Sequence, residues 1–305
     1  MATWTKLGRV FAPDERTPWA VTHAHLPTPI VLGDRIRVFF AGLDPQKLGR
    51  VGWVDVDRRD PTRVLAVCSA PVVELGALGA FDDSGITPSC ALVVGDELRL
   101  YYVGWQRAQR TPYALYGGLA ISRDGGDSFT RFSRAPVLDR SDAEPFSRGA
   151  PFVRTTPGGG FELAYWSCLR WTETAGVVHY NNVLRGGPSG DGLQFAPSYP
   201  ILLETEAGDF SVGRPWLLEE GPMRHLWFTV RSHREADRIG YARSVDGGPF
   251  ERADSGLGIS TEGWDSEMVC YAAVLRDEER CWLFYNGNNH GATGFGVARL
   301  DGRLS

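Results

Sequence analysis

The sequence predicts an all-β fold, a five-bladed β-propeller whose blades are four-stranded antiparallel sheets. A short apolar run that ends in aromatic residues recurs five times, with starts roughly 60 residues apart, at Asp34, Asp96, Gly160, Arg224 and Arg280. Turn-forming glycines and prolines separate the strand-like runs, and almost no segment has helical periodicity. One propeller blade has about this length, so the repeats predict a single domain over residues 1–305.

The first strand of each blade is expected to line the central channel. Each aromatic run is preceded by a segment with ionisable residues, which a plain core strand avoids because burying an unpaired charge is costly. These segments are 22–29, 81–89, 145–152, 209–216 and 263–270. Because first strands converge on the propeller axis, we expect their polar side chains to form one charged pocket.

The second strands are the aromatic runs themselves, in which polar and apolar residues alternate as in a strand of period two. The aromatic pairs expected there are Phe39 and Phe40, Tyr101 and Tyr102, Tyr165 and Trp166, Trp227 and Phe228, and Phe284 and Tyr285. Segments with small residues, such as 116–122 and 238–244, are predicted third strands.

Glycine-rich turns are expected between the third and fourth strands, because glycine adopts the positive φ that a hairpin turn requires. The predicted turns are 124–129, 191–195 and 246–250. Proline begins each predicted edge segment, since it cannot donate a hydrogen bond to a ladder. These edge segments are 71–73, 136–138 and 200–202.

Composition narrows the class of partner. A net charge of −5 leaves no basic surface for a phosphate backbone, so we expect no nucleic-acid partner. The first residues lack the apolar core of a signal peptide and no run is long enough to cross a bilayer, so we expect a cytoplasmic protein without a membrane partner. The five cysteines are odd in number and lie mostly in strand-like runs, as buried reduced thiols do.

Four segments, 23–29, 81–89, 263–268 and 285–288, resemble the five-bladed propeller glycoside hydrolases and phosphorylases, the superfamily of arabinanases, invertases and mannoside phosphorylases. More closely, the chain resembles a subgroup of uncharacterised propellers encoded near bacterial surface-polysaccharide and other sugar-biosynthesis genes. The resemblance extends over essentially the whole chain. It implies the fold and the subgroup more specifically than an activity, because one fold supports many functions.

The resemblance also implies a carboxylate mechanism, with an Asp of blade one as base or nucleophile, an Asp in blade two and a Glu of blade three as acid. This chain departs from that pattern in blade one, where His23 and His25 stand in place of the Asp. In blade three, Glu144 falls just outside the first-strand segment. The inherited mechanism therefore cannot be transferred unchanged.

Asp83 and Glu267 are the predicted catalytic carboxylates. Glycosidic cleavage generally uses one carboxylic acid to protonate the leaving oxygen and one ionised carboxylate to attack or to activate water. The two residues fall at corresponding points of blades two and five, and we expect Glu267 to be the acid and Asp83 its ionised partner. Neighbouring Asp82 and Asp265 are predicted to contact substrate, with turn or strand-entry caps as the alternative.

His23 is predicted to be catalytic and His25 to bind substrate. Two residues apart on a strand, both imidazoles face the same way. They could act as a general base, as a hydrogen-bonding wall or, together with His290, as metal ligands, and purely structural histidines are the alternative. Nothing in the sequence identifies a metal, and no cofactor is expected.

Three arginines suggest an anionic ligand. Arg148 and Arg214 hold matched places in blades three and four, and Arg231 follows the aromatic run of blade four. A forked guanidinium suits a carboxylate or phosphate, although each arginine could instead neutralise a neighbouring acid. Trp105 is expected to stack on a sugar. The other predicted substrate-binding residues are His25, Asp82, Asp209, Asp265 and Asn288.

The predicted function is that of a glycosidase-like enzyme, acting as a hydrolase, phosphorylase or transglycosylase on a sugar or sugar conjugate in the central funnel. An anionic substrate and a biosynthetic pathway fit the arginines and the resemblance. The alternatives are a non-catalytic carbohydrate-binding propeller and a glycosidase fold repurposed for another acid–base reaction. The sequence leaves the sugar, the linkage, the stereochemical outcome and the oligomeric state open.

Overall fold

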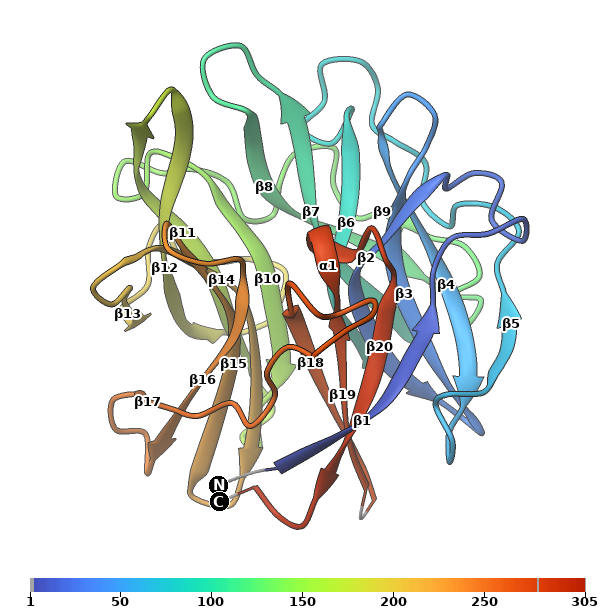
Figure 1. Ribbon diagram of the computed structural model, residues 1–305. Coiled ribbons are helices and arrows are strands. Elements are labelled where there is room, and N and C mark those ends of the chain that lie inside the picture. Colours follow the sequence, from blue (N-terminus) through green and yellow to red (C-terminus); the bar gives the residue numbers. More distant parts are fainter. Residues whose placement is uncertain (1–2, 279, 305) are drawn as a thin grey trace.

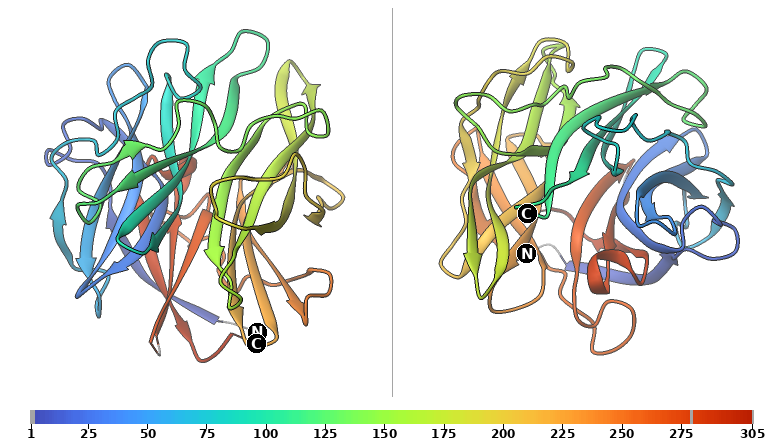
Figure 2. Two further views of the ribbon diagram at one scale, coloured as in Figure 1. Left: turned by 180° about the vertical axis from the view of Figure 1, so that it is seen from behind. Right: turned by 90° about the horizontal axis from the view of Figure 1, so that it is seen from above.

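Five antiparallel blades stand around one axis in the computed structural model, which describes residues 3–278 and 280–304 (Figure 1). A parallel pair, Gly49 opposite Gly85, joins blades one and two into one sheet. Seen from above, the blades follow one another around the ring in chain order (Figure 2, right). The all-β, five-bladed fold predicted from the repeats is therefore confirmed. Residues 1–2, 279 and 305 of the predicted domain lie outside the described residues.

Each of the first four blades consists of four consecutive strands. Blade one contains β2 (Thr22–Leu32), β3 (Arg35–Leu43), β4 (Gly49–Asp57) and β5 (Val64–Val67). Blade two contains β6 (Gly85–Val94), β7 (Glu97–Arg107), β8 (Tyr113–Ser122) and β9 (Thr130–Arg131). Blade three contains β10 (Arg148–Thr155), β11 (Phe161–Thr174), β12 (Val177–Ser189) and β13 (Ile201–Leu203). Blade four contains β14 (Asp209–Glu220), β15 (Met223–Ser232), β16 (Arg238–Val245) and β17 (Glu251–Ala253).

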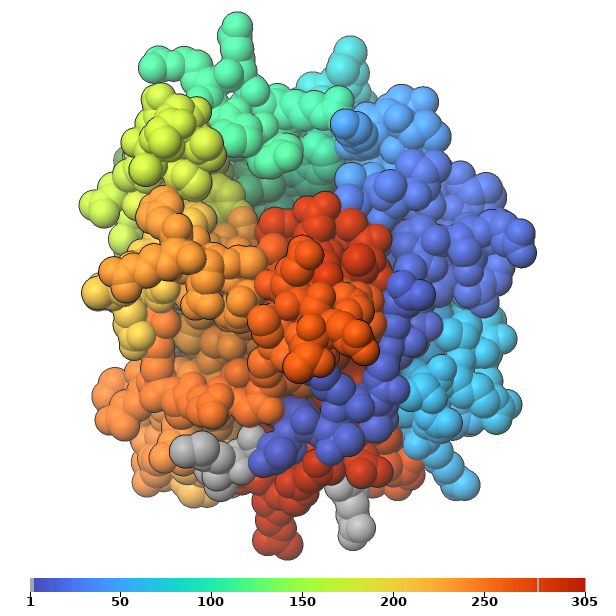
Figure 3. All heavy atoms as spheres, viewed as in Figure 1, coloured from blue at the N-terminus to red at the C-terminus, as the bar shows by residue number. Residues whose placement is uncertain are grey.

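The fifth blade takes its outer strand from the beginning of the described chain. It contains β18 (Cys270–Asp277), β19 (Arg280–Asn286), β20 (Phe295–Asp301) and β1 (Thr3–Phe11). Strand β1 pairs antiparallel with β20, from Thr3 opposite Asp301 to Phe11 opposite Phe295. In the space-filling view, the blue atoms of the N-terminal segment lie against the red atoms of this blade (Figure 3). This pairing closes the ring because it joins both ends of the chain in one sheet.

The aromatic pairs lie on the second strands β3, β7, β11, β15 and β19, as predicted. Most of these rings are completely buried, and they form much of the core between neighbouring blades. The predicted glycine turns fall between the third and fourth strands of blades two, three and four. Alternating polarity therefore located the second strand of every blade.

Three predicted first strands begin later than the sequence suggested, and in blade three β10 begins at Arg148, three residues into the expected segment. In blade two, residues up to Ser84 form turns before β6 begins at Gly85, and in blade five β18 begins only at Cys270. Gly263, with φ 93°, lies in the loop that leads to β18. Asp83 and Glu267 are therefore loop residues and do not belong to the first strands.

Within the described residues, the only helix is the short α1 (Asn288–Gly291), which follows β19. It lies at the upper end of blade five in Figure 1, beside β2. No helix in the described part of the chain has the length and apolar character needed to span a membrane.

Candidate functional site

A ring of kinked positions surrounds the axis, one from each first strand. The five residues are Leu26, Thr87, Ala150, Arg214 and Tyr271. The first four are each followed by proline, which lacks the N–H that a regular ladder requires, and in every first strand the pairing register shifts at or just after this position. A β-bulge re-aims a side chain, so the repeat points one residue per blade toward the axis.

Backbone strain is concentrated in the same ring. Leu26, Ala150, Arg214 and Tyr271 have φ values between 48° and 58°, in the left-handed region that L-residues rarely adopt. His23, three residues before Leu26 in blade one, has φ 65°. Strained residues cluster at functional sites, where the surrounding structure holds a side chain in one direction.

The ring forms the floor of a cavity of about 650 Å³, lined by residues of all five blades. Its upper wall includes Trp105, Arg107 and Tyr113 at the ends of β7 and β8, which project at the top of Figure 1. Trp166 and Tyr180 of blade three complete an aromatic wall. A cavity of this size and aromatic lining suits a ligand of the size of a sugar conjugate.

Among the described residues, the lysine and arginine side chains give the cavity lining a positive charge. Lys47, Arg107, Arg214 and Arg231 line the cavity, and no Asp or Glu does so among the residues that the structure describes. The low dielectric of such a cavity strengthens the attraction between these cations and a bound anion.

Arg214 is held across the axis of the ring. Its side chain is buried, and Nη2 donates to the Pro27 carbonyl at 2.9 Å and to Thr28 Oγ1 at 3.1 Å, both in blade one. Burial lowers the pKa of Arg214 to about 9, because the charged form is desolvated. Among the described residues, Nε and Nη1 have no hydrogen-bond partner. The alternative, in which Arg214 neutralises a neighbouring acid, is therefore not supported.

Arg231 connects two tyrosines and an acid. Its Nη1 donates to the Tyr180 hydroxyl and its Nη2 to the Tyr271 hydroxyl at 2.6 Å, while Nε lies 3.3 Å from Asp237 Oδ2. Burial opposes the charge of the guanidinium, but the phenols and Asp237 raise the pKa of Arg231 overall. Burial likewise raises the pKa of Tyr271, and the Arg231 charge opposes that shift.

Two histidines, His25 and His290, flank Tyr271 at the junction of blades one and five, and His23 lies beside His25. The His25 ring centroid is 4.9 Å and the His290 centroid 6.2 Å from that of Tyr271, and His23 lies 6.3 Å from His25. Burial, followed by the charge of His290, lowers the pKa of His23 and holds that of His25 well below its usual value. His290 Nε2 lies 3.3 Å from Asp237 Oδ2. Neutral imidazoles can accept protons, so this wall can perform acid–base chemistry.

Five predicted site residues line the cavity. They are His23, His25, Trp105, Arg214 and Arg231. The expectation that His23, Asp83, Arg148, Arg214 and Glu267 share one pocket is met only by His23 and Arg214. Asp82, Arg148, Asp209, Asp265 and Asn288 also lie outside the lining.

Three predicted site residues, Asp82, Arg148 and Asp265, belong instead to a contact that recurs in blades two, three and five. In each, a buried carboxylate accepts a hydrogen bond of 2.6–3.0 Å from the tyrosine of the second strand and pairs with a cation. The three sets are Asp82 with Tyr102 and Arg131, Glu144 with Tyr165 and Arg148, and Asp265 with Tyr285 and Lys6. These contacts explain why Asp82, Arg148 and Asp265 face the blade core, because a buried charge needs an ion-pair or hydrogen-bond partner there.

The remaining predicted residues hold loops in place. Asp83 accepts hydrogen bonds from the Gly79 N–H and the Ser84 hydroxyl, both at 2.8 Å, as a turn cap does. Glu267 is exposed. Asn288 Oδ1 accepts the backbone N–H of Glu267 at 2.8 Å, and Asp209 pairs with Arg252 at 3.1 Å.

Sequence reasoning missed Tyr180 and Tyr271 and treated His290 only as a possible metal ligand. A signal for Tyr271 existed, because it stands at the blade-five counterpart of the residue before proline in the other four first strands. Tyr180 had no comparable signal, since it lies on the third strand of its blade. Within the described residues, no group of three or more His, Cys, Asp or Glu side chains could hold a metal ion.

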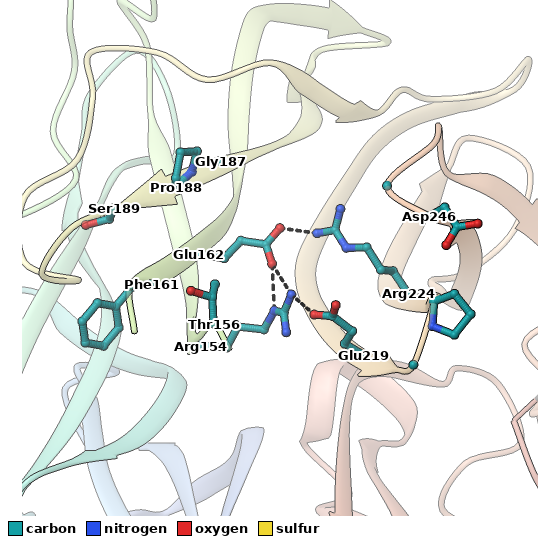
Figure 4. A pocket seen from close by; sticks show the side chains of 14 residues that line it. Arg154, Thr156, Phe161, Glu162, Gly187, Pro188, Ser189, Glu219, Arg224 and Asp246 are labelled. Atoms are coloured by element: carbon teal, nitrogen blue, oxygen red, sulfur yellow. Dashed lines mark hydrogen bonds and ion pairs between the residues drawn. The ribbon is translucent and has the colours of Figure 1, made fainter. Parts of the chain in front are cut away.

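A second pocket of about 570 Å³ lies between blades three and four (Figure 4). Glu162 of β11 is paired with Arg154 of β10 and Arg224 of β15, and Arg154 also pairs with Glu219 of β14. The charges face one another across the blade boundary in Figure 4 and satisfy each other. This network joins two blades, and its carboxylates are engaged by arginines.

Comparison with known proteins places the chain among relatives of the same length. No family model matches it. "Uncharacterized protein Rv1502" of Mycobacterium tuberculosis (strain ATCC 25618 / H37Rv) is 34% identical over 302 residues, which cover 98% of this chain and 99% of that protein. "Uncharacterized protein MT1551" of Mycobacterium tuberculosis (strain CDC 1551 / Oshkosh) is 34% identical over the same extent.

Solved structures share the fold at much lower identity. A structure described as "Glycoside hydrolase" has a TM-score of 0.75 and 16% identity, covering 100% of this chain and 94% of its own. One from work on the GH130 family of mannoside phosphorylases scores 0.70 at 14% identity, covering 98% and 93%. The endo-arabinase from Bacteroides thetaiotaomicron VPI-5482 scores 0.67 at 12% identity, covering 95% and 97%. The chain thus has the fold of propeller glycoside hydrolases and phosphorylases, and by its sequence it belongs to the family of Mycobacterium tuberculosis Rv1502.

Proposed function

We propose that the protein converts a sugar conjugate bound in the axial cavity, using imidazole groups for acid–base chemistry. The observation that carries this proposal is the histidine wall, where His25 and His290 flank Tyr271 and His23 lies beside His25, in a cavity that no carboxylate of the described residues lines. The fold shared with glycoside hydrolases and phosphorylases supports a carbohydrate ligand. A cytoplasmic location and a bacterial biosynthetic pathway remain part of the proposal.

His23 is the proposed general base. Its Nδ1 lies 2.9 Å from Thr22 Oγ1, which leaves Nε2 for a ligand. Because burial lowers its pKa, the imidazole is neutral at physiological pH and ready to accept a proton. The strained backbone of His23 fixes its direction at the cavity wall.

His290 is the proposed second proton carrier. Asp237 Oδ2 lies 3.3 Å from Nε2, so an N–H at this nitrogen is expected to point to the carboxylate, which leaves Nδ1 for a ligand. Trp105 and Trp166 supply faces on which a sugar ring can stack. Acid–base catalysis by positioned side chains contributes about 10²- to 10⁴-fold in rate, which sets the scale of the expected effects.

A second candidate function is carbohydrate binding without turnover. It is favoured by the absence of Asp and Glu from the cavity lining formed by the described residues, because most glycoside hydrolysis uses a carboxylate pair. The same cavity would then hold its ligand through hydrogen bonds and stacking alone.

The test screens the purified protein against sugar phosphates, nucleotide sugars and uronic acid conjugates. Binding is followed by thermal shift and conversion by NMR. We expect a bound compound to be converted, and His23→Asn to lower turnover about 10²-fold or more while affinity is retained. The control is His233→Asn, which alters a histidine outside the cavity lining.

Two results would contradict the proposal. Tight binding without conversion by the wild type would favour the binding module. Full turnover in His23→Asn, together with lost turnover in Glu267→Gln or Asp83→Asn, would restore the carboxylate mechanism predicted from the sequence.

A further inference from the structure

Arg231 arranges two phenol hydroxyls on one wall of the cavity, Tyr180 from blade three and Tyr271 from blade five. We propose that these two hydroxyls form a clamp for an anionic group, a carboxylate or a phosphate, carried by the sugar conjugate. This inference rests on the proposed carbohydrate function and names the chemical class of its ligand.

The two hydrogen bonds between Arg231 and the phenol oxygens have a fixed direction. A guanidinium nitrogen can only donate, so both phenol oxygens act as acceptors toward Arg231. The proton of each phenol must therefore point to a different acceptor. Among the described residues, neither Tyr180 nor Tyr271 donates its hydroxyl proton to a protein group, although both rings line the cavity.

Other buried tyrosines of the fold behave differently. Tyr101 donates its hydroxyl proton to the Gly192 carbonyl at 2.8 Å. The second-strand tyrosines of blades two, three and five donate theirs to buried carboxylates. The protein thus supplies acceptors to these structural tyrosines, whereas the described residues offer none to the hydroxyl protons of Tyr180 and Tyr271. Buried polar groups are normally hydrogen-bonded, so the ligand is the expected acceptor.

Both phenols are held in place before a ligand arrives. Tyr271 has φ 58°, and its backbone N–H donates to Thr229 Oγ1 at 2.8 Å. The Tyr180 ring is stacked on Trp166 and stands edge-on to Trp171. Preorganised donors bind an anion without the cost of reorganising side chains.

The surrounding charge fits an anion. Four cationic side chains line the cavity, while Asp237 is the carboxylate that pairs with Arg231. Arg214, on the cavity floor, has no carboxylate within ion-pair distance among the described residues. Hydrogen bonds to a charged acceptor are about twice as strong as those between neutral groups, so an anionic oxygen gains more than a sugar hydroxyl does.

The experiment measures affinity by calorimetry for four probes, namely glucose 1-phosphate, glucuronate, inorganic phosphate and neutral glucose. We expect glucose 1-phosphate or glucuronate to bind at least about tenfold more tightly than glucose, since an ionic hydrogen-bonded contact has that effect on affinity. The first two probes distinguish a phosphate from a carboxylate.

The variants Tyr180→Phe and Tyr271→Phe remove the hydroxyls and keep the rings. Each is expected to weaken binding of the anionic probe about tenfold while leaving glucose affinity unchanged. The matched control is Tyr116→Phe, which alters a buried tyrosine of β8 outside the cavity lining. Melting temperatures confirm that each variant is folded.

The proposal is overturned if glucose binds as tightly as the anionic probes, if no anionic probe binds, or if both folded Phe variants keep full affinity. Its failure is distinguishable from failure of the proposed chemistry. His23→Asn tests turnover and is expected to preserve anion affinity, whereas the tyrosine variants test affinity alone.

Discussion

At the scale of single residues, the site depends on imidazoles that burial keeps neutral. His25 is packed against Tyr271, and its Nε2 has no hydrogen-bond partner among the described residues. Burial is the main cause that holds the pKa of His25 well below 6.5, and the nearby His290 and His23 act in the same direction. Protonating this ring inside the fold is therefore costly.

This shift predicts a pH dependence of stability. The unfolded chain takes up a proton at His25 near pH 6.5 and the folded chain does not, so the stabilisation is complete above that pH and is lost as pH falls toward the lower folded pKa. In this window one such group contributes a slope of about 1.4 kcal/mol of unfolding free energy per pH unit. Urea unfolding between pH 8 and 5 should show a shallower slope for His25→Asn than for the wild type or for His233→Asn. Equal slopes in all three would exclude His25 as the titrating group.

A second residue-scale prediction concerns Asp82, which the sequence suggested as a substrate contact. The buried carboxylate accepts from Tyr102 at 3.0 Å and pairs with Arg131 at 2.8 Å. Asp82→Asn should lower the free energy of unfolding by about 1–3 kcal/mol, because it leaves buried partners imperfectly bonded. Affinity for the anionic probe should not change. A folded variant of wild-type stability that has lost ligand affinity would return Asp82 to the binding site.

At the scale of elements, the first strands combine pairing with a kink that turns one residue toward the axis. Ala150 shows this most simply, since its methyl group needs no positive φ and yet its φ is 48°. The following Pro151 interrupts the ladder, and the register shifts between Gly149 and Phe152. The other blades place larger side chains at the same point, including Arg214 and Tyr271.

Replacing Ala150 by glycine tests the strain in this ring. Glycine adopts positive φ without a steric penalty, so Ala150→Gly should be neutral or stabilising by up to about 1 kcal/mol despite its greater unfolded-state entropy. Ala164→Gly, in the buried second strand of the same blade, should be clearly destabilising by thermal or urea unfolding. Equal destabilisation by both substitutions would contradict the strained geometry.

At the scale of the whole molecule, the fold depends on the outer strand that closes blade five. Phe11 of β1 is 3% exposed and packs against Phe40 of blade one and Phe295 of blade five, at centroid distances of 5.2 and 6.1 Å. It therefore links the first and last blades at the point of closure. Loss of packing at Phe11 therefore affects both blades.

Phe11→Ala should cost about 3–5 kcal/mol of unfolding free energy, the usual loss for a buried aromatic residue. Phe132→Ala, which truncates a ring that is 45% exposed, should change stability by about 0.5 kcal/mol or less. The comparison is made by urea unfolding of both variants. Similar small losses in both would mean that closure through β1 does not stabilise the ring.

The fold could be predicted from the sequence because each blade repeats one pattern independently. All five aromatic second strands indicate the same kind of blade, so the fold prediction does not depend on any single repeat. The carboxylates could not be placed in this way. Asp82 and Asp265 occur in segments that look like channel strands, yet their side chains face the tyrosines of their own blades. Spacing alone does not show which side of a loop a carboxylate faces.

The cavity was predictable in part. His23, His25, Trp105, Arg214 and Arg231 were found from residue type and blade position, and all of them line it. Tyr180 was not found in this way, because its role depends on a contact with Arg231 of the next blade, 51 residues further along the sequence. Contacts of this kind are determined by how the blades pack against each other, and no short sequence pattern indicates them.

The most direct test of the account is a crystal structure with the tightest-binding anionic sugar probe. The predicted result is a ligand in the axial cavity, with its anionic oxygens within hydrogen-bond distance of the Tyr180 and Tyr271 hydroxyls and its sugar ring beside His23. A ligand bound instead between blades three and four at Glu162, or with its anionic group directed away from both tyrosines, would contradict it.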